Sequence, residues 1–228
     1  MPKGLFITAT GTDVGKTFVS AIIVKKMREM GFNCGYFKPA LSGAEMKDGK
    51  IVAGDCEYVL KTAGMTANPL NFASYIFKTA VSPHLAAKIE GVSISKEKIL
   101  ADFEKKKQEF DYIVVEGAGG IICPFNLKDE KIILPDIIKM LGLDVIVIAK
   151  AELGSINSAV LTTDYIKNAG IGLKGIILNK YNEKDFMQRD NKLQIENLTG
   201  VEVIAQVKEN EKDFEIDKDK LLSLFKEI

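Results

Sequence analysis

"TATGTDVGKTFVS", Thr8–Ser20, joins a short apolar run, "GLFI", to an amphipathic run, "FVSAIIVKKM". A glycine-containing loop at a helix N-terminus directs several backbone N–H groups at one point, at the positive end of the helix dipole. The trio "GKT", Gly15–Thr17, matches the end of the Walker A pattern G-x-x-x-x-G-K-[ST], whose lysine reaches a terminal phosphate and whose hydroxyl binds magnesium. Thr10 replaces the first glycine of that pattern, and the nearest glycine is Gly11. The stretch therefore predicts a phosphate-binding loop between a strand and a helix.

The composition of the chain excludes several classes of partner. Its 228 residues suffice for one large α/β domain, and we expect residues 1–228 to form a single domain. The 31 basic and 31 acidic residues balance, so nucleic acid is not an expected partner. The run "EKKKQE" around Lys105–Lys107 is expected to be the solvated face of a helix.

Hydropathy and cysteine usage indicate a cytoplasmic protein without membrane contacts. Apolar runs such as Val145–Ala149 are far shorter than the roughly 20 residues that span a bilayer. The N-terminus lacks the apolar stretch of a signal peptide. The three cysteines, Cys34, Cys56 and Cys123, form no C-x-x-C pair, so we expect reduced, mostly buried thiols rather than disulfides or a zinc site.

Apolar runs of strand length alternate with segments of helical period. The runs lie at 4–9, 34–38, 112–116, 144–149, 174–179 and 201–207, with a weaker seventh at 71–77. The expected helices are Lys16–Met30, Asp55–Ala63, Pro83–Ile89, Ser95–Glu109, Leu134–Leu141, Ser155–Ala169, Asp185–Leu198 and Lys218–Lys226. Nearly continuous β-branched runs are typical of strands covered on both faces. The pattern predicts an α/β fold of the P-loop NTPase type, with a mostly parallel central sheet of about seven strands flanked by helices on both faces.

Ligands of such sheets bind at the carboxyl ends of the strands, so the residues that follow each strand are candidates for the site. After the second predicted strand comes "FKPALSG", Phe37–Gly43, in which Pro39 is expected to end the strand. Lys38 would then project beside the phosphate loop as a second cation, with Ser42 in the same loop. We expect Lys16 and Lys38 to be exposed cations rather than core residues.

After the third predicted strand comes "VVEGAGG", in which Glu116 would hold magnesium and Gly117 and Gly119 would let the backbone approach phosphates. Asp55, at the start of a predicted helix, is either a second magnesium ligand or a helix N-cap, and the two roles are compatible. The sole histidine, His84, lies where a helix begins, and a structural role is its default interpretation.

Seven segments in this order resemble the dethiobiotin synthetase family. They extend from the N-terminus to about residue 180 and read "TATGTDVGKT", "FKPALSG", "AGDCEYV", "SPH", "VVEGAGG", "KAELGSIN" and "GIILNK". The resemblance implies a magnesium- and ATP-dependent ring closure of biotin biosynthesis, its penultimate step. In that reaction 7,8-diaminononanoate and carbon dioxide become dethiobiotin through a carbamate and a mixed anhydride, with release of ADP and phosphate. It also implies a homodimer on a P-loop α/β fold, with sites near the subunit interface.

Residue roles follow from the resemblance by matching position. The implied nucleotide-binding residues are Asp13, Val14, Gly15, Lys16, Thr17, Phe18, Asp55, Glu116, Gly117, Ala118, Gly119 and Asn179, of which Asn179 would recognise adenine. The implied magnesium ligands are Thr17, Asp55 and Glu116. The implied catalytic residues are Thr12, Lys16, Lys38 and Ser42, and three of these, Thr12, Lys38 and Ser42, would contact the diamine.

"KAELGSIN", Lys150–Asn157, opens a predicted helix after a buried strand and is therefore a second candidate anion site. In the family that it resembles, this segment is lent by the other subunit. The residues implied to bind the substrate carboxylate are Leu153, Gly154, Ser155 and Asn157. The alternative is a plain strand–helix turn.

A ParA- or MinD-like ATPase switch, which binds a protein partner on the same fold, is the alternative to the synthetase. Such switches typically carry a lysine five positions before the phosphate-loop lysine, and here Gly11 stands at that position.

Overall fold

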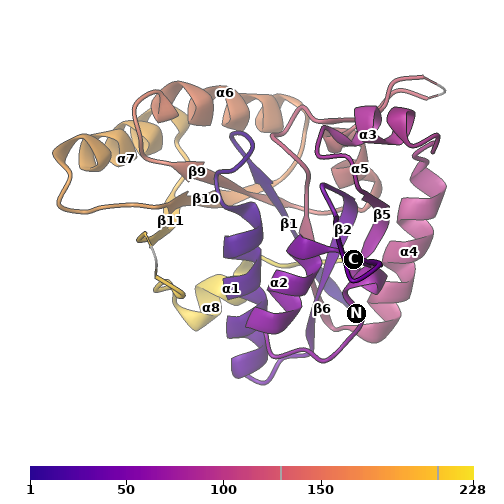
Figure 1. Ribbon diagram of the computed structural model, residues 1–228. Coiled ribbons are helices and arrows are strands. Elements are labelled where there is room, and N and C mark those ends of the chain that lie inside the picture. Colours follow the sequence, from indigo (N-terminus) through magenta and orange to yellow (C-terminus); the bar gives the residue numbers. More distant parts are fainter. Residues whose placement is uncertain (129, 210) are drawn as a thin grey trace.

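Helices lie on both faces of one central sheet (Figure 1). The computed structural model describes residues 1–128, 130–209 and 211–228. Within these residues, seven parallel strands occur in the order β11–β10–β9–β1–β6–β2–β5. Their bounds are Val203–Val207, Leu173–Asn179, Val145–Lys150, Lys3–Ala9, Tyr112–Glu116, Cys34–Ser42 and Ala73–Phe77. The predicted fold class is confirmed, and so is the weak seventh strand, β5.

The helices divide between the two faces of the sheet. One face packs on α1 (Lys16–Glu29), α2 (Gly54–Thr62) and α8 (Lys218–Ser223). The opposite face packs on α3 (Pro83–Ile89), α4 (Lys96–Glu109), α5 (Leu134–Met140), α6 (Ser155–Asn168) and α7 (Phe186–Thr199). No described helix is long and apolar enough to cross a bilayer.

Alternate residues of the central strands enter different cores. In β1, Leu5 and Ile7 pack in the core that contains α1, whereas Phe6 packs in the core that contains α4. Successive side chains of a strand point to opposite faces, so an apolar run without alternation fills both cores. This explains why the runs in the sequence predicted strands covered on both sides.

Two predicted ends differ from the structure by more than two residues. Strand β2 does not stop at Pro39 but continues to Ser42. Pro39 lies beyond Phe37, the last residue of β2 that pairs with β6, so that pairing loses no N–H donor. The last helix ends at Ser223 rather than Lys226, because the chain then forms β12 (Lys226–Glu227), which pairs antiparallel with β1.

Short elements complete the described chain. Two small hairpins join β3 to β4 and β7 to β8, and a 3₁₀ helix, η1, precedes β5. Their bounds are Glu45–Lys47, Lys50–Val52, Pro124–Asn126, Ile132–Ile133 and Pro69–Phe72. The three cysteines are free and buried, as predicted.

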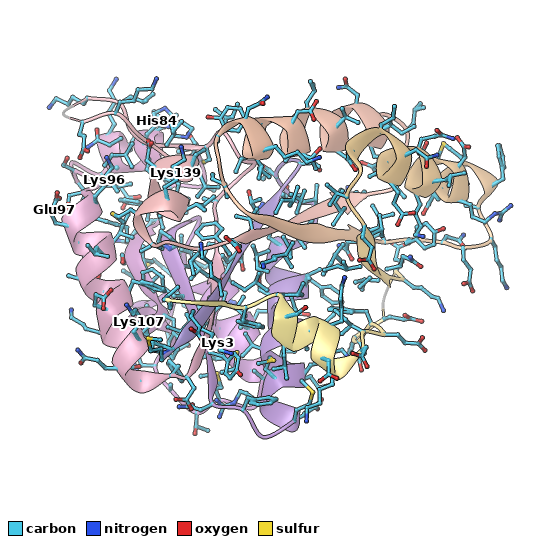
Figure 2. The ribbon with its side chains drawn as sticks, turned by 180° about the vertical axis from the view of Figure 1, so that it is seen from behind. Lys3, His84, Lys96, Glu97, Lys107 and Lys139 are labelled. Atoms are coloured by element: carbon cyan, nitrogen blue, oxygen red, sulfur yellow. The ribbon has the colours of Figure 1, made fainter. Side chains whose placement is uncertain are left out.

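The basic run of α4 is only partly a solvated face. Lys105 is exposed, and Figure 2 labels Lys107 near the C-terminal end of this helix. Lys106 departs from the expectation because it is buried: its ammonium lies 4.6 Å from the centre of the Phe72 ring and pairs with Glu109 at 2.6 Å. A long side chain can bury its methylene groups and still keep its charge paired.

Close packing around Gly35 generates a test of the fold. Gly35→Ala is expected to lower the free energy of unfolding by about 1–3 kcal/mol, because the added methyl group would overlap the Phe110 ring. The matched control is Gly54→Ala at an exposed glycine, where an added methyl group meets no described atom within 4 Å. Its expected effect is below about 1 kcal/mol. Denaturant unfolding measures both variants, and equal midpoints would contradict the packing described here.

Candidate active site

The phosphate loop lies between β1 and α1 and is held by its own backbone and by Asn179. The chain turns through the left-handed region at Asp13, with φ 56°, and at Gly15, with φ 102°. The side-chain amide of Asn179 donates to the carbonyl of Val14 at 2.9 Å, and a Cβ on Gly15 would collide with this amide. Gly15 therefore satisfies both the backbone angle and the close approach. The Lys16 ammonium donates to the carbonyl of Gly11 at 3.1 Å.

A cavity of about 1060 Å³ opens beside this loop, at the carboxyl ends of β1, β2 and β6. Most of the predicted site residues line it. From the loop and α1 these are Thr12, Asp13, Gly15, Lys16, Thr17 and Phe18. From the other elements they are Lys38, Ser42, Asp55, Glu116, Ala118 and Gly119.

Glu116 is the centre of the hydrogen bonds in this cavity. It ends β6, and its side chain is fully buried, at 0 % exposure. Its Oε1 accepts from the Thr17 hydroxyl at 2.7 Å and from the Lys38 ammonium at 2.6 Å. Its Oε2 accepts from the Tyr36 hydroxyl at 2.7 Å. A buried carboxylate with these donors is satisfied as a charged group.

Lys38 joins the two carboxylates of the cavity. Its ammonium lies 2.5 Å from Oδ2 of Asp55 and 2.6 Å from Oε1 of Glu116. Burial alone would lower the pKa of Lys38, but Glu116 and then Asp55 outweigh burial and raise the pKa above its usual value. Lys38 is therefore a fixed positive charge.

The two lysines differ in their electrostatic surroundings. Burial lowers the pKa of Lys16, Glu116 opposes this shift, and Lys38 adds to it. Lys16 is 8 % exposed and Lys38 5 % exposed, so the expectation of exposed cations was wrong. The Lys16 ammonium donates to the carbonyl of Gly11, and the Lys38 ammonium donates to Glu116. These hydrogen bonds offset the free-energy cost of burying the two charges.

Asp55 is the second residue of α2, whose N-cap is Ala53. The helix N-cap interpretation of Asp55 was therefore wrong, and its carboxylate pairs with Lys38 instead. Among the described residues, no group of three or more His, Cys, Asp and Glu side chains could hold a metal ion. Two carboxylates and the Thr17 hydroxyl nevertheless fit Mg²⁺, which binds hard oxygen ligands and takes the remainder from substrate phosphates and water.

The other residues predicted for this end of the sheet have different surroundings. The hydroxyl of Ser42 is buried and has no hydrogen-bond partner in the described part of the chain. Gly117 packs against Phe6 and Leu134, where a side chain would not fit. His84 is the second residue of α3 (Figure 2), and its Nδ1 lies 3.0 Å from the Ser82 hydroxyl.

The segment predicted to bind a carboxylate lies apart from this cavity within the described chain. Leu153 is 87 % exposed, and Gly154 and Asn157 are exposed as well. Gly154 has φ 88° at the N-cap of α6, and the Ser155 hydroxyl donates to the carbonyl of Glu152 at 2.6 Å. The chain thus presents this loop on its surface.

Tyr36 and Cys123 are among the residues of the cavity region that the sequence did not assign to the site. Tyr36 lies inside an apolar strand and contacts Glu116. Its position two residues before Lys38 places both side chains on the same face of β2, and this spacing could have indicated that Tyr36 belongs to the site. Burial, and then the charge of Glu116, raises the pKa of Tyr36, so its hydroxyl keeps its proton. Cys123 lines the cavity, and burial raises its pKa to about 11 despite the opposing charge of Lys16.

Solved structures share the fold at low sequence identity. The MinC:MinD cell division complex of Aquifex aeolicus superposes with a TM-score of 0.55 and 16% identity, over 92% of this chain and 83% of that chain. A ParA family ATPase from Chlorobium tepidum gives a TM-score of 0.55 and 15% identity, over 98% of this chain and 90% of that chain. At this identity the likeness shows the P-loop fold alone.

Sequence comparison identifies the family of the chain as well as its fold. A family model described as an AAA domain matches residues 3–213. A curated relative from Clostridium botulinum strain 657, named ATP-dependent dethiobiotin synthetase BioD, is 51% identical over 228 residues, all of both chains. A relative of the same name from strain Eklund 17B is 53% identical over 203 residues, 89% of each chain. The chain is therefore an ATP-dependent ligase and belongs to the dethiobiotin synthetase family.

Proposed function

We propose that this chain closes the ureido ring of dethiobiotin from 7,8-diaminononanoate, CO₂ and ATP, and releases ADP and phosphate. This is the penultimate step of biotin biosynthesis. The observation that carries the proposal is the group around Glu116, in which Thr17, Lys38 and Asp55 meet beside the phosphate loop. Relatives about half identical over the full chain carry the synthetase name.

The phosphate loop would bind the triphosphate through its backbone N–H groups, among them those of Val14 and Gly15. Lys16 would leave the carbonyl of Gly11 and bridge the phosphates, and its buried position favours the exchange of a neutral partner for an anion. Asn179, at the end of β10 and against this loop, would recognise adenine. Gly117, Ala118 and Gly119 would contact the nucleotide.

The diamine would lie on the β2 side of the cavity, against Thr12, Lys38 and Ser42. The unpartnered hydroxyl of Ser42 supports this placement, because a buried polar group without a partner is available for a ligand. The 7-amino nitrogen attacks the carbon of CO₂, and loss of one proton leaves a carbamate. A carbamate oxygen then attacks the γ-phosphorus while the bond to ADP breaks, which gives a carbamic–phosphoric mixed anhydride.

Ring closure needs no protein nucleophile. The 8-amino nitrogen attacks the anhydride carbon, phosphate leaves with the electron pair, and the amine proton is lost. The contribution of the chain is positioning and charge: Lys16 and Lys38 offset the negative charge of the carbamate and of the leaving phosphate. Thr17, Asp55 and Glu116 would hold Mg²⁺, which when bound screens the charge of the triphosphate.

A homodimer would complete the site. The substrate carboxylate is far from the reacting amines, so the phosphate loop cannot bind both ends. In the loop that opens α6, Leu153, Gly154 and Asn157 are exposed and available to a second copy of the chain, whereas Ser155 is buried and would contribute through its backbone N–H. The expected location is the cytoplasm. Residues 1–228 would be one domain, because both cores share one sheet.

An ATPase switch that binds a protein partner is the second candidate, favoured only by the shared fold. Phosphate release with and without the diamine and bicarbonate separates the two functions. Release is expected to require both small molecules. Release that proceeds unchanged without the diamine would overturn the synthetase and favour the switch.

Replacement of Lys38 tests its proposed charge role. Lys38→Ala is expected to lower kcat/KM at least about ten-fold, a loss of about 1.4 kcal/mol of transition-state stabilisation. It should also lower the free energy of unfolding by about 3 kcal/mol, because Glu116 loses its buried counter-charge. The control is Lys26→Ala, which removes an outer ion pair with Asp213, at an expected loss below about 1 kcal/mol. Wild-type turnover in Lys38→Ala would contradict the proposed role of Lys38.

The magnesium role of Asp55 has a control on the same helix. Asp55→Asn is expected to raise the Mg²⁺ concentration for half-maximal activity at least about ten-fold. Glu57→Gln, which changes another carboxylate in the first turn of α2, should leave this concentration unchanged. Steady-state rates at fixed ATP and varied Mg²⁺ measure both variants. Equal magnesium dependence in Asp55→Asn and the wild type would exclude Asp55 as a ligand.

The subunit-shared site is tested at two glycines that flank α6. Proline cannot adopt the positive φ of Gly154, 88°, or of Gly170, 68°. Gly154→Pro is expected to raise the KM for the diamine several-fold without changing that for ATP, whereas Gly170→Pro should change neither. Mixing Gly154→Pro with Lys38→Ala subunits should restore activity, because one hybrid site has both intact halves. Verified heterodimers without restored activity would place the carboxylate site within one chain.

A further inference from the structure

The Tyr36 hydroxyl is the one donor to Glu116, among those described, that the proposed function does not use. Tyr36 lies in β2 and is fully buried, at 0 % exposure. Its hydroxyl donates to Oε2 of Glu116 at 2.7 Å. The ring itself packs in the core shared by β1, β2 and α1, as the phenylalanine ring of a Tyr36→Phe variant would. The contribution of the hydroxyl, a hydrogen bond to Glu116, can therefore be tested separately from the packing of the ring.

The two carboxylate oxygens of Glu116 accept hydrogen bonds from different sides. Oε1 accepts from Thr17 and Lys38, the groups that face the phosphate loop and the cavity. Oε2 accepts from Tyr36, on the side of the buried sheet. A carboxylate held from both sides cannot rotate without losing a charge-assisted hydrogen bond. The Tyr36 contact thus fixes which oxygen faces the cavity.

The backbone makes this contact rigid. In the parallel pairing of β2 with β6, Tyr36 is opposite Val114, so its side chain reaches along the sheet to Glu116, two residues further on. Both residues belong to central strands of the sheet, which is packed on both faces. A donor on such an element positions its acceptor more closely than a loop residue or water would.

We propose that Tyr36 is a positioning residue for magnesium–nucleotide binding: its hydroxyl holds Oε2 of Glu116 so that Oε1 stays with Thr17 at the cation site. This rests on the proposed function, in which Glu116 and Thr17 hold Mg²⁺. Without the hydroxyl, Oε2 is left without a donor, and the carboxylate can turn toward the Lys38 ammonium, which lies 2.6 Å from Oε1. The cation site then loses an oriented ligand, whereas the metal-free phosphate loop is unchanged.

Calorimetric titration with ADP tests this, in the presence of Mg²⁺ and in the presence of a chelator. Tyr36→Phe should weaken the Mg²⁺-dependent gain in ADP affinity by about ten-fold or more, as is typical when a hydrogen-bond partner of a metal ligand is removed. Its metal-free ADP affinity should stay within about two-fold of wild type. The control is Tyr75→Phe, which removes a hydroxyl that accepts from the Ser95 N–H at 3.0 Å, on the other face of the sheet. This control should keep the full gain.

A double-mutant cycle separates positioning from general destabilisation. In a Glu116→Gln background, Tyr36→Phe should cause little further loss of the Mg²⁺-dependent gain, because the two residues act as one unit. Equal losses in the two backgrounds, or a gain in Tyr36→Phe within about two-fold of wild type, would overturn the proposal. Absence of any Mg²⁺-dependent gain in the wild type would instead overturn the proposed nucleotide site.

A measurement on the unsubstituted tyrosine keeps the proposal testable if Tyr36→Phe fails to fold. In protein labelled with ¹³C at the tyrosine Cζ, the resonance that Glu116→Gln displaces identifies the hydroxyl bonded to Glu116. In the wild type, that resonance should shift on addition of ADP with Mg²⁺ and stay in place with ADP and chelator. No shift, or the same shift in both titrations, would contradict the inference.

Discussion

The ion pair between Glu116 and Lys38 sets the arrangement of the site. Glu116 is fully buried, and a buried carboxylate is stable only with a close counter-charge and further donors. The counter-charge comes from β2, and the hydroxyl donors come from β2 and from α1. Four segments that are distant in sequence, β2, β6, the start of α1 and the start of α2, therefore have to meet at one point. A fold that separated β2 from β6 would leave the charges of Lys38 and Glu116 buried without compensation.

The sheet was predictable because its signal is local and repeated. Each central strand carries apolar residues at both odd and even positions, as Leu5, Phe6 and Ile7 do, and only a strand between two helical layers can bury both sets. The two wrong predictions, the ends of β2 and of the last helix, depend on which strands pair in the sheet rather than on the local sequence pattern. Pro39 is accepted in β2 because the pairing with β6 has already ended, and Lys226 leaves the helix because β1 has a free partner position. Neither partner can be read from the local sequence.

The candidate site was predictable where polar residues follow an apolar strand, as Lys38 and Glu116 do. It was not predictable where a polar atom belongs to a core residue. In the sequence, Tyr36 is an ordinary aromatic residue of a strand. The β2–β6 register places its hydroxyl near Glu116, and that register is not visible in the local sequence. The burial of Lys16 and Lys38 was missed for the same reason, since isolated lysines are expected at the surface and become buried only beside acceptors from other segments. The proposed role of the exposed loop at Gly154 would depend on a second copy of the chain, which the sequence of one chain does not describe.

The fold that this chain shares with MinD and ParA does not by itself decide its chemistry. Those structures share the fold with this chain at 15% to 16% identity, and at that identity the likeness does not extend to the site. The chemistry depends on the side chains of the site: on the β2 side of the cavity, Lys38 supplies a fixed positive charge, and Ser42 has a buried hydroxyl without a partner among the described residues. A buried hydroxyl without a partner costs free energy unless a ligand bonds to it. In the proposed reaction the diamine would supply that bond while it is desolvated and held against the γ-phosphate for ring closure.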